Sequence, residues 1–160
     1  MTLSSHVEWA IHCCTVLAGL EPDERLSTMT LADFHGVPKE YLSKALQALA
    51  RAGLIEGSLG PGGGYKLART PRSVTLLNVV EAVEGREPSF QCQEIRGNNP
   101  CLKRSEKPTG VCAVARAMYR ADEAWRRELR SVTLEDLIRT VARDVPAEIL
   151  ERSREFLLRK

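Results

Sequence analysis

Three cysteines fall within one stretch of 21 residues, at Cys92, Cys101 and Cys112. Apolar periodicity stops after Val83 and resumes at Val111, and the residues between are rich in Asn, Pro and Gly. This pattern predicts a long loop that is neither helix nor strand. Loops of this length inside a compact domain are usually functional or disordered, and the cysteines favour function. Thiolates ligate metals and iron-sulfur clusters and carry redox chemistry.

A second pair of ligand-type side chains lies near the N-terminus, in a helix predicted from Ser5 to Gly19. Glu8 and His12 are four residues apart, which places their side chains one turn apart on the same side of that helix. Two such groups can share one metal ion. On spacing alone, a surface ion pair or hydrogen bond is the simpler interpretation. Cys13 and Cys14 follow the buried side and are predicted to be small core residues.

Composition narrows the class of protein. The chain has 160 residues, 43% of them hydrophobic, which suffices for one domain or a small domain with an extension. There is no run of eighteen apolar residues and no signal-like N-terminus, so we expect a cytoplasmic protein without a membrane anchor. An odd count of five cysteines then favours thiols or metal ligands over disulfides. The net charge of +2 indicates no partner, but basic residues outnumber acidic ones between Phe34 and Ser73.

Two short helices follow the first. The first of these two helices is predicted to be capped by Thr28 or Thr30 and to stop at Gly36. The second is predicted to begin with Pro38 and to end at Gly53. A break of three or four residues makes this pair a helix-turn-helix, although a solvated helix in a bundle would show the same outer face. The second helix buries a stripe of Leu42, Ala45, Leu46, Leu49 and Ala50. Its candidate DNA contacts are Lys39, Glu40, Tyr41, Ser43, Lys44 and Gln47.

A glycine-rich turn over residues 57–64 separates two short strand candidates, at 54–56 and 65–68. This arrangement predicts a β-wing. A phosphate-binding loop is the rival interpretation, but no Gly-Lys-Ser/Thr ending is present and no helix follows directly. The candidate DNA contacts of the wing are Ser58, Leu59, Gly60, Gly62, Gly63 and Lys66.

The remaining pattern is helical. A short helix is expected to end at Gly85, and a long helix is expected to run from Val111 to about Arg130. Cys112 is predicted to lie in the first turn of the long helix, where the helix dipole favours the thiolate over the thiol. The long helix has an apolar stripe that calls for a partner, either a symmetry mate or another part of the chain. That stripe comprises Val111, Ala115, Met118, Trp125 and Leu129. Thr133 is predicted to cap a further helix, and Val145-Pro146 to separate it from a last amphipathic segment.

The predicted fold class is therefore mainly α with a small β-wing: a winged helix-turn-helix domain plus a long dimerisation helix. The expected segments are a DNA-binding domain (1–85), a cysteine-bearing loop (86–111), a dimerisation helix (112–132) and a C-terminal helical tail (133–160).

Several runs resemble the winged-helix regulators of the Rrf family, the group that contains IscR, NsrR and RsrR. They are Leu31-Ala32-Asp33, Tyr41-Leu42, Ala52-Gly53-Leu54-Ile55, Gly60-Pro61-Gly62-Gly63-Gly64-Tyr65 and Cys112-Ala113-Val114-Ala115-Arg116. The resemblance covers about residues 1 to 132. It implies a homodimeric transcription factor, not an enzyme, that binds a partly palindromic DNA operator. The resemblance also implies that the protein senses redox state or nitric oxide through an iron-sulfur cluster, as many members of the family do.

The opening Val7-Glu8-Trp9-Ala10-Ile11-His12-Cys13-Cys14 is most similar to RsrR-type members. That similarity implies a 2Fe-2S cluster held by cysteines of one subunit and by a Glu and a His of the other, which Glu8 and His12 match. Cys112 is the strongest cysteine candidate, Cys92 matches the family's first loop cysteine, and Cys101 is a third ligand or a spare. Leu59 stands where the IscR type commonly has an Arg suited to a narrow minor groove.

The sequence thus predicts a redox-responsive regulator, with a 2Fe-2S cluster preferred over 4Fe-4S. One alternative is a nitric-oxide-sensing 4Fe-4S cluster on Cys92, Cys101 and Cys112, with Glu8 as the outside ligand. A second is a cluster-free switch in which Cys92 and Cys112 form a disulfide. Structural zinc is a third, because zinc also favours His and Cys. An enzyme using Cys112 activated by His12 is disfavoured, since no oxyanion-hole motif is present.

Overall fold

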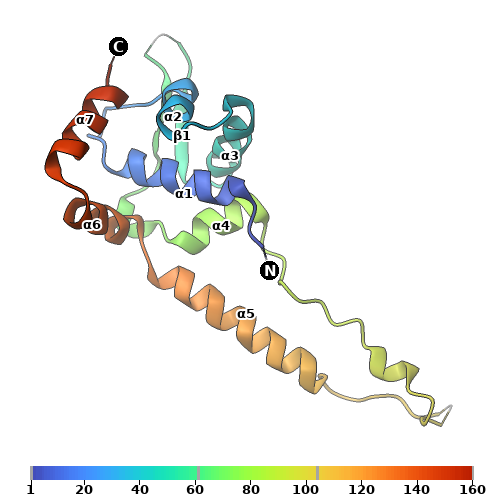
Figure 1. Cartoon of the computed structure of the whole chain (residues 1–160). Coiled ribbons are helices and arrows are strands. Elements are labelled where there is room, and N and C mark those ends of the chain that lie inside the picture. The colour runs from blue at the N-terminus through green and yellow to red at the C-terminus, as the bar shows by residue number, and fades with distance from the viewer. Residues whose placement is uncertain (1, 61, 104, 160) are drawn as a thin grey trace. The chain divides into compact units, whose positions relative to one another are not determined.

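The computed structural model describes residues 2–60, 62–103 and 105–159. The chain forms two compact units, which we call the larger unit (2–86 with 129–159) and the smaller unit (87–128). The described residues are mainly helical with a two-stranded antiparallel sheet (Figure 1), which confirms the predicted fold class. No helix among them is both long and apolar enough to cross a membrane.

Helix α1 (Ser5–Ala18) is central to the larger unit. It packs against α3 (Lys39–Arg51), α4 (Leu76–Glu84) and α6 (Leu134–Asp144). Cys13 and Cys14 are fully buried on this helix, which confirms their predicted core role. Burial raises the pKa of Cys13 to about 12 and raises that of Cys14 further, so neither forms a thiolate at neutral pH.

The predicted helix-turn-helix is present as α2 (Thr28–His35) and α3. The cap of α2 is Ser27, whose hydroxyl accepts from the amide of Thr30, and not Thr28 or Thr30 as predicted. Ser27 takes the cap because it has extended backbone, directly after a bridge that ties Leu26 to the wing. The predicted stripe of α3 is confirmed, since its leucines and Ala45 are buried in the core.

The wing consists of β1 (Ile55–Ser58) and β2 (Gly64–Leu67), paired from Ile55 opposite Leu67 to Ser58 opposite Gly64. Leu26 extends this sheet, because its amide and carbonyl both bond to Tyr65, at 3.0 and 2.8 Å. A short 3-10 turn, η1 (Pro71–Ser73), leads from the wing to α4.

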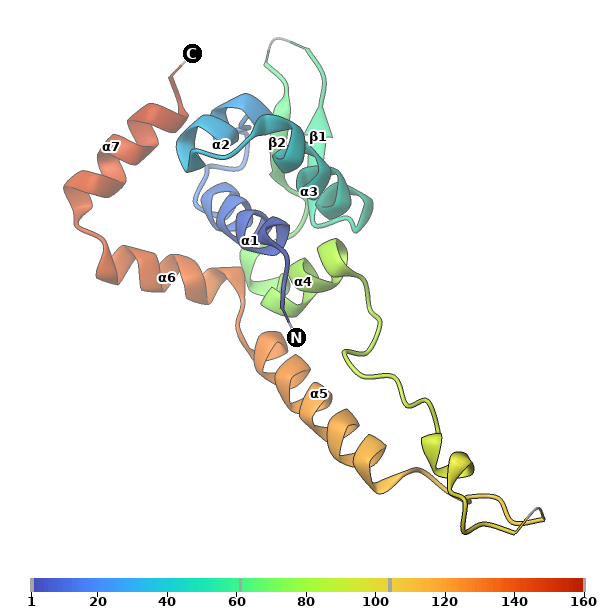
Figure 2. The same ribbon diagram turned by 45° about the vertical axis from the view of Figure 1, so that its right-hand side comes forward.

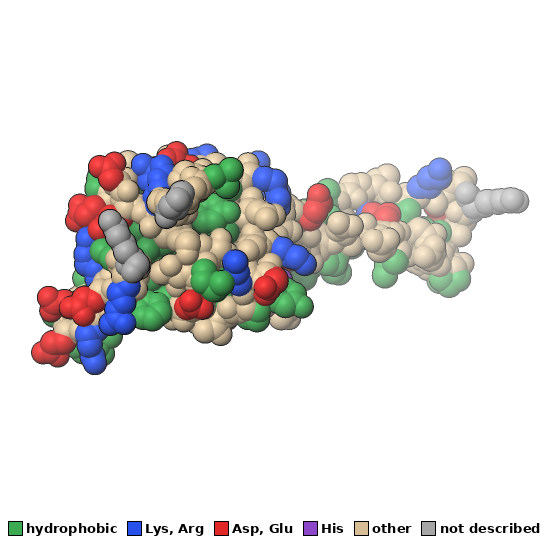
Figure 3. Space-filling view, turned by 90° about the horizontal axis from the view of Figure 1, so that it is seen from above, with side chains coloured by type: hydrophobic (Ala, Val, Ile, Leu, Met, Phe, Trp, Pro, Cys, Tyr) green, Lys and Arg blue, Asp and Glu red, His purple; other side chains and the backbone are tan. Residues whose placement is uncertain are grey.

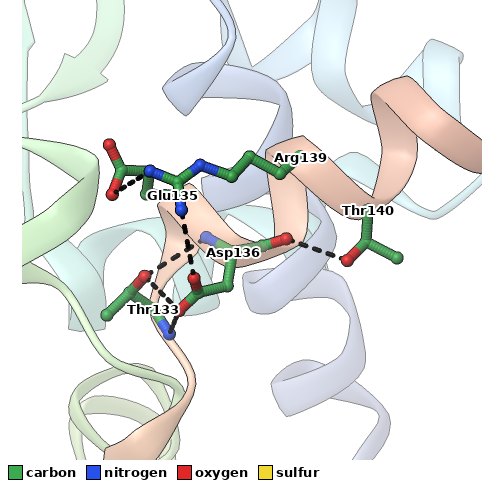
Figure 4. A network of polar contacts seen from close by, with 5 residues as sticks. All are labelled: Thr133, Glu135, Asp136, Arg139 and Thr140. Atoms are coloured by element: carbon green, nitrogen blue, oxygen red, sulfur yellow. Dashed lines mark hydrogen bonds and ion pairs between the residues drawn. The ribbon is translucent and has the colours of Figure 1, made fainter.

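The chain returns to the larger unit with α6 and α7 (Ala147–Leu157). Thr133 caps α6 as predicted: its amide and hydroxyl donate to the carboxylate of Asp136, whose own amide donates to the Thr133 hydroxyl (Figure 4). Thr75 caps α4 with the same motif and forms an antiparallel bridge to Thr133. Leu134 and Leu157 join the core cluster, so both helices complete this unit.

The smaller unit contains a 3-10 turn, η2 (Ile95–Asn98), and most of α5 (Ala113–Ser131). The turn departs from the prediction of a loop without helix, because four residues are too few to produce a hydrophobic period. Helix α5 begins at Ala113, so Cys112 lies just before its first turn and not within it. The carbonyl of Cys112 accepts from the amide of Arg116 and so starts the helical ladder.

Glu84 holds the start of α1 against the end of α4. Its Oε1 accepts from the Ser4 hydroxyl at 2.6 Å and the Ser4 amide at 3.0 Å, and these bonds lower the pKa of Glu84 below 4.5. Because the folded-state pKa is depressed, this stabilisation is present above pH 4.5 and is lost as the pH falls through the folded value.

We expect Glu84→Gln to lower the free energy of unfolding at neutral pH by less than about 1 kcal/mol, as is usual for exposed pairs. Urea denaturation of both proteins should show this difference shrinking below pH 4.5. A difference that stayed constant with pH would mean that the glutamine acts through packing and not through the lost charge.

Candidate cluster site and DNA-binding surface

Cys92 and Cys112 line one pocket of the smaller unit, with a volume of about 360 Å³. Both thiols are half-buried, whereas Cys101 is exposed and lies outside the lining. The rest of the wall is largely apolar and includes Phe90, Ile95, Val114 and Ala115. Of the three predicted cysteines, the structure therefore brings two together.

The position of Cys112 before α5 favours its thiolate. The backbone amides of Ala115 and Val114 hydrogen-bond to the sulfur and lower the pKa of Cys112 below 9.0, and the positive charge of Arg96 lowers it further. Glu94 opposes this shift. Unpaired amides at a helix N-terminus are a general means of stabilising an anion, including a metal-bound thiolate.

Arg96 organises the loop around this pocket, a role that no pattern in the sequence indicated. Its guanidinium donates to both carboxylate oxygens of Glu94, at 2.6 and 2.7 Å, and to the carbonyl of Gly110 at 2.7 Å. The amide of Glu94 in turn donates to the sulfur of Cys92 at 3.4 Å. Arg96 thus ties together the two ends of the loop that carry the thiols.

The loop is also fixed to α5. The amide and hydroxyl of Ser89 donate to Asp122, and the Arg126 guanidinium binds the same carboxylate at 2.9 Å. Arg126 also donates to the carbonyl of Glu87 at 3.1 Å. The Ser89 hydroxyl and then Arg126 lower the pKa of Asp122, so this carboxylate keeps its charge. Polar bonds therefore order the segment that leads to Cys92.

Glu8 and His12 lie exposed on one side of α1, as predicted, and line a shallow hollow of about 340 Å³ in the larger unit. In the described part of the chain no hydrogen bond or ion pair joins them, which leaves the surface-pair interpretation without support. The His12 ring lies 5.7 Å from the ring of His35 in α2. Burial, and then His12, lower the pKa of His35.

No group of three or more His, Cys, Asp or Glu side chains among the described residues is arranged to hold a metal ion. Glu8 and His12 belong to the larger unit and the loop cysteines to the smaller unit. Glu8 and His12 offer two side chains of ligand type, and Cys92 and Cys112 offer two more in their own pocket.

The outer face of α3 presents most of the predicted DNA contacts to solvent. Lys39, Glu40, Tyr41, Lys44 and Gln47 are exposed, and Ser43 is half-buried. The Lys44 ammonium lies 5.6 Å from the centre of the Tyr41 ring, which restrains both side chains. Figure 3 shows basic and acidic side chains interspersed over the visible face of the larger unit.

At the wing, Ser58, Leu59, Gly60 and Gly62 are exposed, and Gly63 is half-buried. Lys66 is the exception among the predicted contacts, because its ammonium donates to the carbonyl of Pro22 at 3.1 Å and lies 3.6 Å from Glu56. Its observed role is to hold the wing against the segment before α2.

Comparison with known proteins identifies the family. The Rrf2 family model, described as an iron-dependent transcriptional regulator, matches residues 3–140. The transcriptional repressor NsrR of Streptomyces coelicolor is 32% identical over 139 residues, covering 86% of this chain and 88% of NsrR.

Two solved structures share the fold. CymR, the global cysteine regulator of B. subtilis, has a TM-score of 0.67 at 23% identity, covering 88% of this chain and 98% of CymR. IscR of T. potens has a TM-score of 0.68 at 19% identity, covering 94% of this chain and 96% of IscR. The chain contains a winged helix with an exposed recognition face, and the Rrf2 family model matches most of the chain's length. The chain is therefore a DNA-binding transcriptional regulator of the Rrf2 family.

Proposed function

We propose that this regulator is redox-responsive and senses through an iron-sulfur cluster, 2Fe-2S in preference to 4Fe-4S, bound between the subunits of a homodimer. Cys92 and Cys112 of one subunit and Glu8 and His12 of the other are the proposed ligands, as in the RsrR type. Carboxylate and imidazole can replace thiolates on one iron of such a cluster.

The observation that carries this proposal is the shared pocket of Cys92 and Cys112, from which Cys101 is absent. Two thiols face one largely apolar space, and amides before α5 stabilise the thiolate of one of them. This donor set fits half of a four-ligand cluster. Glu8 and His12, exposed and unpaired with each other, fit the other half.

Each residue has a distinct task in this scheme. The cysteines bind as thiolates, and Arg96 orients the loop that carries them. When bound, the cluster supplies reversible one-electron chemistry. His12 and Glu8 link the cluster to α1, which packs directly on the recognition helix α3. A change in the charge or occupancy of the cluster would therefore act through α1 on the position of α3.

The proposed dimer uses α5. Val111, Val114, Met118 and Tyr119 are exposed along or just before this helix. An apolar face of this kind is suited to a second copy, and a two-fold axis would present paired α3 helices to a partly palindromic operator. In this proposal residues 1–85 bind DNA, 86–111 hold the cluster, 112–132 form the dimer contact and 133–160 support the DNA-binding domain.

The test is a visible spectrum of protein purified without oxygen, with iron and acid-labile sulfide counted per chain. We expect absorption that bleaches with dithionite and returns on re-oxidation. DNA selected from random duplexes should bind with an affinity that differs between the two states by roughly 5- to 150-fold. Equal affinity in both states would refute redox sensing, and four irons per cluster would favour the 4Fe-4S alternative.

The same pocket supports a second candidate, a cluster-free thiol switch. Cys92 and Cys112 line a common space, and a lowered pKa of Cys112 favours attack by its thiolate. Oxidation would remove two electrons and two protons and form one disulfide. Colourless, iron-free protein whose DNA affinity responds to peroxide would establish this candidate in place of the cluster.

A further inference from the structure

The larger unit contains a cavity of about 500 Å³, and His12 is the single residue of its wall to which the proposed function gives a role. It lies between α1, α2, α6 and α7, and Figures 1 and 2 show α6 and α7 along one side of α1 and α2. Its wall is mostly aliphatic and aromatic, with Val16, Leu20, Phe34, Ile138, Val141 and Leu150 as its main apolar residues. No candidate DNA contact lines it.

One polar atom in this wall has no partner. His35 lines the cavity, and its Nε2 is buried without a hydrogen bond in the described part of the chain. The remaining polar side chains of the wall, apart from the exposed His12, are already bonded within the protein. Thr15 donates to the carbonyl of Ile11, Ser153 to that of Ile149, and Arg154 to the carboxylate of Glu24. Burying a polar atom without a hydrogen-bond partner costs free energy, so a ligand group that bonds to this nitrogen would bind favourably.

We propose that this cavity binds a small, largely apolar molecule that carries one hydroxyl or carboxyl group. Sites for small molecules commonly have volumes of about 300–1,000 Å³, apolar walls and a few placed polar atoms. A hydroxyl or a carboxylic acid can donate or accept, and therefore complements either tautomer of His35. A docked helix is disfavoured, because roughly one turn of a helix about 11 Å across would fill the cavity.

The location gives such a ligand a means of regulation. α2 is the first helix of the helix-turn-helix, and the cavity separates part of it from α7. A ligand that fills this space adds contacts between them. All residues of the wall belong to the larger unit, so the site does not include the cysteine loop, and it shares only His12 with the proposed cluster ligands.

The dye 1-anilinonaphthalene-8-sulfonate, whose fluorescence rises in apolar sites, is a suitable probe for the full-length protein. We expect saturable binding that 2-naphthol displaces better than naphthalene, by roughly 2- to 10-fold, because only the naphthol can bond to His35. His35→Phe should remove that difference and keep the dye bound. Equal displacement by both compounds in the unaltered protein would overturn the role of His35 and with it the assigned ligand class.

A matched pair of variants tests the position of the site. Ala142 is exposed on α6 and lines the cavity, so Ala142→Trp should weaken dye binding by about tenfold. Ala147 is exposed on α7 outside the lining, and Ala147→Trp should leave it unchanged. Unaltered binding in both variants would place the dye elsewhere. Sedimentation of the unaltered protein and of Ala142→Trp provides a second readout. If the dye does not bind and Ala142→Trp changes the oligomeric state, the cavity is a protein interface and the proposal is overturned.

Discussion

Protein carrying Cys112→Ser is expected to contain at least about tenfold less iron and sulfide per chain than the unaltered protein, and to lose its visible absorption. Serine does not supply the thiolate that the amides of Val114 and Ala115 stabilise. The fold should survive, because the residue lies just before α5, where serine is a favoured cap. Iron and sulfide analysis after anaerobic purification measures the loss, and circular dichroism checks the helices.

Cys101→Ser is the matched control. Cys101 belongs to the same loop but is exposed and lies outside the pocket of Cys92 and Cys112. We therefore expect its iron content and spectrum to equal those of the unaltered protein. Equal loss of iron in both variants would instead support a cluster on three cysteines, and unchanged iron in Cys112→Ser would remove this pocket from the cluster site.

Gly63→Ala is expected to weaken operator binding, because the wing has no room for a side chain at this position. An added Cβ would lie 2.4 Å from the carbonyl oxygen of Ser58 and 2.8 Å from the carbonyl carbon of Leu59. Both contacts are with backbone, so the turn itself must shift. Strain of about 1–3 kcal/mol at such a site corresponds to roughly 5- to 150-fold in affinity if DNA binding must restore the native turn.

Gly62→Ala provides the comparison, since a Cβ there would meet no atom within 4 Å. Fluorescence anisotropy with selected duplex DNA should separate the two variants. A Gly63→Ala protein that binds like the unaltered one would exclude the wing from the DNA interface. Equal weakening by both would trace the effect to the lost flexibility of glycine, and not to the crowded backbone.

Local patterns predicted most of the fold. The 3.6-residue spacing of Leu42, Ala45, Leu46 and Leu49 identified the recognition helix and its buried side. The glycine run between two short strand segments identified the wing. Capping was less certain, because Ser27, Thr28 and Thr30 are all suitable cap residues. The choice among them depended on the bridge between Leu26 and Tyr65, which is not a local feature.

The arrangement of the candidate site was less accessible to sequence reasoning. The sequence identified all three loop cysteines but could not separate Cys101 from the other two, because their grouping depends on how the loop folds. Arg96 was missed for the same reason: its contact with Gly110 spans fourteen residues without regular structure. Periodicity likewise showed that α6 and α7 bury one side, but not that Leu134 and Leu157 join the same core cluster as the buried residues of α1.

The placement of Leu134 and Leu157 also constrains when the protein can fold during synthesis. Residues of the first helix leave the ribosome long before residue 157, yet the core around them remains incomplete until that leucine arrives. A nascent chain paused after the cysteine loop would still expose apolar surface that α6 and α7 later cover, which is the condition under which chaperones bind and aggregation begins. Completion of the DNA-binding domain therefore follows translation of the cysteine loop, although most of that domain precedes the loop in the sequence.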